Sequence, residues 1–138
     1  MADKKPAANS LAGRIDTLEE FYEFMLAYAS QGLRGDEEAP GPDVREYLER
    51  ADAALDGLAR AAGAAVAEIV GAAGEDFAEF IKVLGDDADK ARTGIRIVKT
   101  KSRISSQLID NLNGSIHLRA VLTDLFLIDE LLKEPDAG

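Results

Sequence analysis

The residues best suited to chemistry in this sequence are its carboxylates, which outnumber the Lys and Arg residues by 26 to 16. Two acidic pairs stand one helical turn apart, so each could place two oxygen ligands on one face: Glu20 with Glu23, and Asp76 with Glu79. Calcium requires roughly six to eight such ligands, and a helical di-iron centre requires Glu-x-x-His motifs. The only histidine, His117, has a glycine at that position. We therefore expect solvated helix faces and no metal site.

Nucleophilic and cofactor chemistry lacks its usual residues. The chain has no cysteine, and no serine stands in a Gly-x-Ser-x-Gly setting, so His117 has no nucleophile to activate. Phosphate-binding glycine loops follow strands, whereas Gly63, Gly71 and Gly74 lie within a helical pattern. We expect no catalytic residue and no cofactor, and therefore no enzyme.

The most informative feature is the separation of charge along a chain whose net charge is −10. Residues 90–103 carry six bases and no acid, whereas residues 36–89 carry fifteen acids and four bases. On a helix, four of these bases form one face, which we call the basic stripe: Arg92, Arg96, Lys99 and Arg103. We predict that the basic stripe binds a partner.

Three kinds of partner fit the basic stripe. It can pair with the acidic helix that precedes it, in the same chain or in a second copy, or with an acidic protein or lipid, or with nucleic acid. Nucleic acid is least favoured, because interleaved aromatic residues are absent and the acidic chain repels phosphate. Pairing within one chain or between two copies is favoured.

Two charges fall on apolar helical faces. Lys101 lies among Ile97, Ile104 and Leu108, and Asp129 lies among leucines of the last helix. If the helix that contains Lys101 and the last helix form an antiparallel hairpin, Lys101 and Asp129 come within about one helical turn of each other. Our hypothesis is a buried charge pair, inside the bundle or across an interface, because either charge alone would be costly to bury. In the alternative, one or both side chains extend to solvent.

The first element that must position these residues is a helix from Ser10 or Asp16 to about Leu33. Thr17 and Glu20 fit a capping box. Its apolar residues recur every three or four positions: Leu11, Ile15, Leu18, Tyr22, Met25 and Ala29.

Residues 34–42 combine glycine, proline and acids and predict a loop, after which Asp43 can cap a long amphipathic helix over residues 43–69. Residues 61–74 are nearly all small. Each interior glycine costs about 1 kcal/mol relative to alanine, so we expect a neighbouring helix to approach closely. A kink or break at residues 71–74 is the alternative.

Three further helices are expected. A short one spans residues 76–84 and ends at Gly85, and a longer one spans residues 89–112, where a strand around residues 95–97 explains fewer residues. Ser115 can cap the last, over residues 116–133. This last helix is apolar around most of its circumference, so it requires several neighbours.

Composition agrees with closely packed helices. The chain has 138 residues, of which 46% are hydrophobic and only 6% aromatic, which is enough for one core. Acidic and basic residues interrupt its most apolar region, so we expect no transmembrane segment, and no signal-peptide pattern opens the chain. We expect a soluble, cytoplasmic protein.

We therefore predict an all-α helical bundle of four main helices plus one short helix. Residues 1–9 form a disordered arm, residues 10–134 one domain, and residues 135–138 a tail. Heptad spacing and segregated charge predict a non-catalytic interaction or assembly protein that acts through protein–protein contacts and self-associates as a homo-oligomer. One alternative is a peripheral coat on a membrane or granule surface, made by a basic amphipathic helix, and another is a helical nucleic-acid-binding protein.

Overall fold

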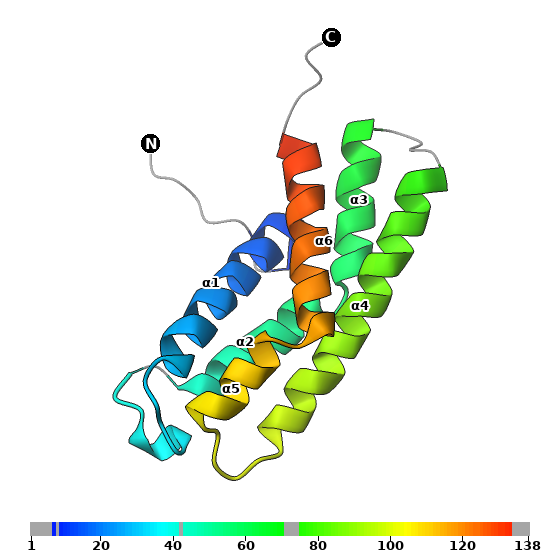
Figure 1. Cartoon of the computed structure of the whole chain (residues 1–138). Coiled ribbons are helices and arrows are strands. Elements are labelled where there is room, and N and C mark those ends of the chain that lie inside the picture. Colours follow the sequence, from blue (N-terminus) through cyan, green and yellow to red (C-terminus); the bar gives the residue numbers. More distant parts are fainter. Residues whose placement is uncertain (1–6, 8, 42, 71–74, 134–138) are drawn as a thin grey trace, which may run out of the picture.

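The computed structural model describes residues 7, 9–41, 43–70 and 75–133, and its described part contains six α-helices and one short 3-10 helix, η1. Figure 1 shows α6 beside α3 and α4 at one end of the molecule, whereas α1, α2 and α5 gather at the other. The helices are α1 (Leu11–Ala29), η1 (Asp36–Glu38), α2 (Val44–Leu55), α3 (Leu58–Val70), α4 (Glu75–Lys99), α5 (Ser106–Asn113) and α6 (Ile116–Lys133). The all-α prediction is confirmed, but the number of helices differs from the four main and one short that we predicted. The predicted break at residues 71–74, the tail and most of the arm lie outside the described residues.

Helix α1 begins at the earlier of its two expected starts. The Ser10 hydroxyl accepts a hydrogen bond from the Gly13 amide at 3.1 Å, which satisfies one of the free N–H groups of the first turn. The predicted Thr17 capping box is wrong, because Thr17 lies inside the helix and its hydroxyl donates to the Gly13 carbonyl at 3.0 Å. The stripe read from the sequence does bury Leu18 and Met25.

The predicted helix over residues 43–69 is two helices. Asp43 caps it as expected, since its carboxylate accepts from the Arg45 amide at 2.9 Å. After Leu55 the chain leaves the helix, and Gly57 adopts a φ of +81°, a left-handed conformation that favours glycine. This turn ends α2 and starts α3 in a new direction.

Helix α4 joins what we predicted as separate elements. Gly85, expected to end the short helix, lies inside α4 and faces α3, where an added Cβ would be 3.2 Å from the Ala59 Cβ. Across the same interface, a Cβ on Gly63 would lie 3.9 Å from Ile81 Cγ2. Small residues therefore allow close contact of α3 with α4, as predicted. The mistaken end at Gly85 arose because a packing glycine resembles a terminating one in sequence.

The predicted helix over residues 89–112 is interrupted. Helix α4 ends at Lys99, residues 100–105 form a loop, and Ser105 caps α5 by accepting from the Leu108 amide at 3.0 Å. The loop contains the buried Ile104, whose side chain holds it against the core. Two of the predicted site residues, Lys101 and Arg103, are therefore in a loop and not on a helix.

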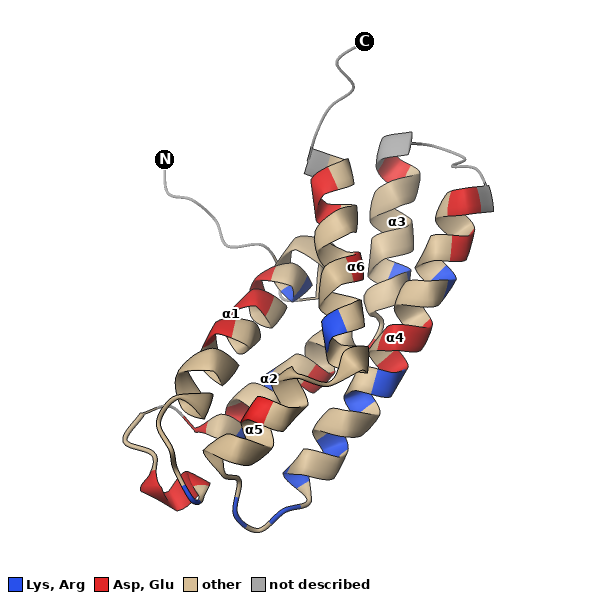
Figure 2. Ribbon diagram, in the orientation of Figure 1, with Lys and Arg blue, Asp and Glu red and all other residues tan. Residues whose placement is uncertain are grey.

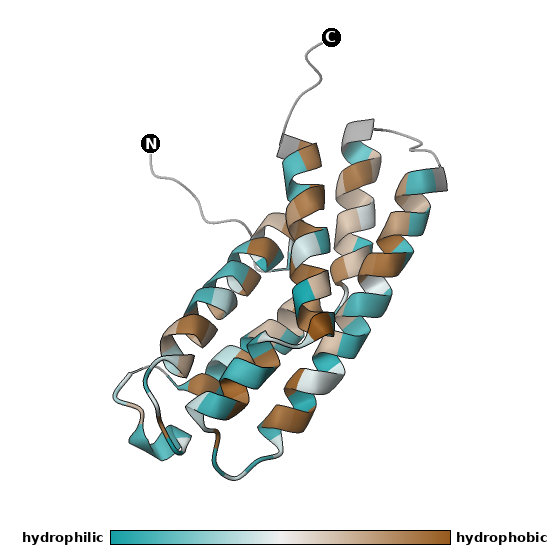
Figure 3. Ribbon diagram, in the orientation of Figure 1, coloured by the Kyte–Doolittle hydropathy of each residue, from teal (hydrophilic) through white to brown (hydrophobic). Residues whose placement is uncertain are grey.

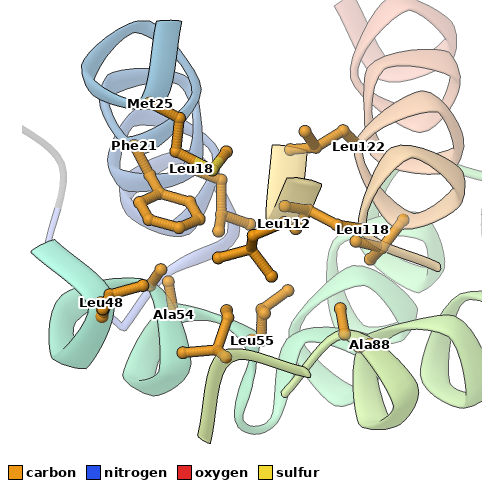
Figure 4. Close-up of a cluster of buried hydrophobic side chains, with 14 of the residues drawn as sticks. Leu18, Phe21, Met25, Leu48, Ala54, Leu55, Ala88, Leu112, Leu118 and Leu122 are labelled. Atoms are coloured by element: carbon orange, nitrogen blue, oxygen red, sulfur yellow. The ribbon is translucent and has the colours of Figure 1, made fainter. Parts of the chain in front are cut away.

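The core is formed mainly by leucine, isoleucine and alanine side chains from all six α-helices. Figure 3 shows the hydrophobic positions along each helix, and Figure 4 shows leucines of α1, α2, α5 and α6 converging at the junction of the two ends. Full burial of one such leucine contributes about 1.5–3 kcal/mol. No helix in the described part of the chain has the length and apolarity needed to cross a membrane.

Candidate functional site

The basic stripe lies against the acidic side of α2. Arg92 Nε donates to Asp52 at 2.7 Å, and its Nη1 donates to Asp56 at 3.2 Å. Arg96 Nε lies 3.6 Å from the second Asp52 oxygen. The hydrogen bond that Arg92 donates to Asp52 raises the pKa of Arg92. Because the Arg92 and Asp52 side chains are only 19% and 18% exposed, this pair is well protected from solvent screening.

The lower part of the basic stripe is paired as well. Lys99 Nζ lies 3.9 Å from Glu49 of α2, and Arg103 hydrogen-bonds Glu37 of η1. Figure 2 shows these basic segments of α4 and its following loop next to acidic segments of α2 and η1. All four residues of the basic stripe thus form ion pairs within the chain, which is the internal pairing that charge segregation favoured.

The α1–α2 and α4–α5 loops are joined by a set of hydrogen bonds that we call the interloop network. Asp36 accepts from the Ile104 amide at 3.0 Å and from Arg45 Nε at 2.9 Å. Burial raises the pKa of Asp36, but these two hydrogen bonds outweigh it and hold the pKa below its usual value. Arg45 also donates to three carbonyl groups at and beyond the end of α4: Lys99, Lys101 and Ser102.

Tyr28 and Ser106 complete the interloop network beneath the surface. The Tyr28 hydroxyl donates to the Ile104 carbonyl at 2.7 Å, and the Ser106 hydroxyl donates to the Tyr28 carbonyl at 2.6 Å. Ser106 also accepts from the Leu33 amide at 2.8 Å. Burial, more than neighbouring carboxylates, raises the pKa of Tyr28 to about 12. Sequence reasoning missed this network, because its members are far apart in the chain and four of them, Leu33, Lys101, Ser102 and Ile104, lie in loops.

The Lys101 side chain is exposed, which contradicts the predicted buried pair with Asp129. The prediction assumed that the helix continued through residue 101, whereas α4 ends at Lys99 and only the Lys101 carbonyl takes part in the interloop network. Asp129 is half-buried on α6. Early helix termination thus turned the lysine outward.

Asp124, another acidic residue of α6, has a raised pKa. Asp124 lies against Asp87 of α4, and one of its carboxylate oxygens is buried without a hydrogen-bond partner in the described part of the chain. Burial, together with the adjacent Asp87 carboxyl, raises the pKa of Asp124 to about 7. In the sequence, the sign of this site is an acidic residue within an apolar helix, and Asp129 fits that description equally well.

The other chemistry-bearing residues are dispersed. His117 is exposed in the first turn of α6, and Glu20 pairs with Arg50 at 3.1 Å on the surface. Asp76 and Glu79 are exposed on α4. No group of three or more acidic or histidine side chains suited to a metal ion occurs among the described residues.

A hollow of about 320 Å³ surrounds the start of α1 and the end of α2. Arg14 reaches from its wall to the last carbonyl groups of α2, at 3.2 Å from Ala53 O and 2.9 Å from Ala54 O. A cation at these carbonyls stabilises a helix C-terminus. The guanidinium therefore has a structural role that accounts for the polar lining of this hollow.

Helix α6 leaves a row of large apolar side chains in solvent, which we call the α6 outer face. Phe126, Leu127 and Leu131 are 40%, 51% and 50% exposed, although the opposite side of α6 is fully buried. Shallow hollows of about 140 Å³ flank the row on both sides. One meets α1 at Tyr22, and the other meets α4 at Phe80.

At the α6 outer face, large apolar residues of α6 adjoin Tyr22 of α1 and Phe80 of α4. Contiguous apolar area of this kind marks interaction sites. The sequence matches no protein-family model, and no curated protein or solved structure is significantly similar to it.

Proposed function

We propose that this chain is a cytoplasmic, non-catalytic interaction protein that self-associates through the α6 outer face. The observation that carries the proposal is the exposure of Phe126, Leu127 and Leu131, at 40–51%, on a helix whose opposite side is fully buried. A protein–protein interface with an apolar centre removes such side chains from water, which stabilises the complex by about 25 cal/mol for each Å² buried.

The ion pairs of the basic stripe also favour this proposal over its two alternatives. A membrane coat or a nucleic-acid binder would use free cations, whereas Arg92 and Arg103 already contact carboxylates of the same chain. Binding of phosphate there would have to displace these acids. The α6 outer face requires no such exchange.

Sedimentation equilibrium of the wild type and two variants tests the proposal. Leu127→Glu places a charge at the centre of the α6 outer face, and Ile97→Glu is the control, since Ile97 is 63% exposed near the far end of α4. We expect a wild-type dimer or higher oligomer, a loss of affinity of about tenfold or more for Leu127→Glu, and no change for Ile97→Glu. A wild type that stays monomeric at millimolar concentration overturns the proposal.

A further inference from the structure

Four exposed residues follow one another along α6, on the side of the α6 outer face that borders α1, and their spacing is the same in both directions. Arg119, Thr123, Phe126 and Glu130 are separated by four, three and four positions. At 100° per residue they lie within an arc of about 60°. All four are exposed, so they form one narrow surface row.

When a second copy of this row runs in the opposite direction, each residue faces one of opposite charge or of complementary size. If a second α6 lies antiparallel on the first, position 119 meets position 130 and position 123 meets position 126. A base then faces an acid, and a small side chain faces a large one. A parallel arrangement would place Arg119 on Arg119 and Phe126 on Phe126, which repels charge and doubles the bulk.

We infer that the α6 outer face binds a second copy of this chain with the two α6 helices antiparallel, about a two-fold axis between Thr123 and Phe126. Phe126 of each copy packs on Thr123 of the other, and Arg119 of each copy pairs with Glu130 of the other. This inference rests on the proposed function, and it specifies the partner and its orientation. Such a two-fold arrangement is isologous, so each contact occurs twice.

The hollow beside α1 suits the Phe126 side chain of a second copy. It holds about 140 Å³ and is lined by Tyr22, Arg119, Leu122, Thr123 and the Phe126 of the same copy. An aromatic ring inserted beside Thr123 would meet the Tyr22 ring at its wall, and aromatic pairs add about 0.5–1.5 kcal/mol to simple burial. Small Thr123 leaves the space that the large Phe126 fills.

The charged ends of the row cannot satisfy each other within one chain. Arg119 and Glu130 are eleven residues apart on one helix, which is roughly 16 Å along its axis. Neither forms an ion pair with another residue in the described part of the chain. A second copy supplies both partners at once.

Charge reversal tests the orientation with little risk to the fold, because the altered side chains are exposed. Arg119→Glu and Glu130→Arg are each measured alone by sedimentation velocity, and then mixed in equal amounts. Arg34→Glu is the control, since the Arg34 side chain is 86% exposed in the α1–α2 loop. We expect each single variant to lose about tenfold in dimer affinity, and the mixture to regain it as a heterodimer.

The outcomes separate this inference from the proposed function. Recovery in the mixture, with Arg34→Glu unchanged, supports antiparallel pairing. If Leu127→Glu abolishes the dimer but both charge reversals leave it intact, the antiparallel pairing is overturned and the proposed function stands. If the wild type is a monomer throughout, the proposed function itself fails.

Discussion

The interloop network and the α6 outer face differ in whether their side chains have partners within the chain. At the loop end, Asp36 and Arg45 are partly buried, and the chain itself supplies their hydrogen-bond partners. On α6, Phe126 and Leu127 are apolar, and the chain leaves them in water. The interactions of the interloop network are completed within the chain, whereas the α6 outer face would be completed only in the proposed dimer. Disruption should therefore unfold the first region and should only dissociate the second.

The largest expected effect is at Asp36. Asp36→Ala leaves the Ile104 amide and the Arg45 guanidinium without their acceptor, so we expect a loss of about 2–3 kcal/mol in the free energy of unfolding. Urea denaturation measures it. Glu38→Ala is the control, since the hydrogen bond that Glu38 accepts from the Arg34 amide at 3.0 Å and its ion pairs at 3.8 Å and 3.9 Å are exposed. Equal losses in both variants would contradict a special role for the interloop network.

Asp36 of the interloop network and Asp124, which lies between α6 and α4, should respond to pH with opposite sign. The pKa of Asp36 is lowered in the fold, so its stabilisation is present above the unfolded pKa and is lost as the pH falls. The pKa of Asp124 is raised to about 7, so the folded state binds the extra proton between the unfolded pKa of 3.8 and about 7. Stability from Asp124 is therefore present below this interval and is lost as the pH rises through it.

Asp124→Asn isolates the second of these responses. We expect the variant to gain on the order of 1–2 kcal/mol over the wild type at pH 8, with a smaller difference at pH 5, after allowance for solvent screening. Thermal unfolding at both pH values measures it. An Asp124→Asn variant with the same stability relative to wild type at both pH values would refute the raised pKa.

A smaller effect is expected at Arg92, where the basic stripe meets α2. Arg92→Gln leaves Asp52 only 18% exposed and without its closest cation, so we expect a loss of about 1 kcal/mol. Arg34→Gln removes a 3.8 Å pair from a side chain that is 86% exposed, so its cost should be near zero. Chemical denaturation of the two variants in low and high salt compares them. A larger loss at Arg34 would show that burial does not set the strength of these pairs.

The smallest effect on folding is expected at Phe126. Phe126→Ala removes an aromatic ring that is 40% exposed, so we expect the stability of the monomer to change by less than about 1 kcal/mol. The dimer affinity should nevertheless fall markedly, because the same ring is central to the inferred interface. Denaturation at low concentration and sedimentation at high concentration measure the two quantities. A loss of several kcal/mol in the monomer would place Phe126 with the core instead.

Residue spacing and capping residues predicted that the chain is helical and predicted some of the helix ends. The errors occurred where one residue type fits two different structures. The stripe of α1, the Asp43 cap and the start of α6 follow from spacing and capping chemistry. Gly57 ends α2 and Gly85 does not end α4, although both are single glycines in helical sequence. The difference is their environment, because Gly85 faces Ala59 across a close helix contact whereas Gly57 adopts a left-handed turn.

The sequence by itself determined the all-α class and the separation of acids from bases, because both depend only on residues close together in the chain. Only the tertiary structure decided which charges meet. It ended α4 before Lys101, placed Asp124 against Asp87 and joined Asp36 to Arg45 and Ile104. It also decided which side of the apolar α6 remained in water. Such contacts depend on the register between packed helices, which is set by the shapes of side chains distant in sequence.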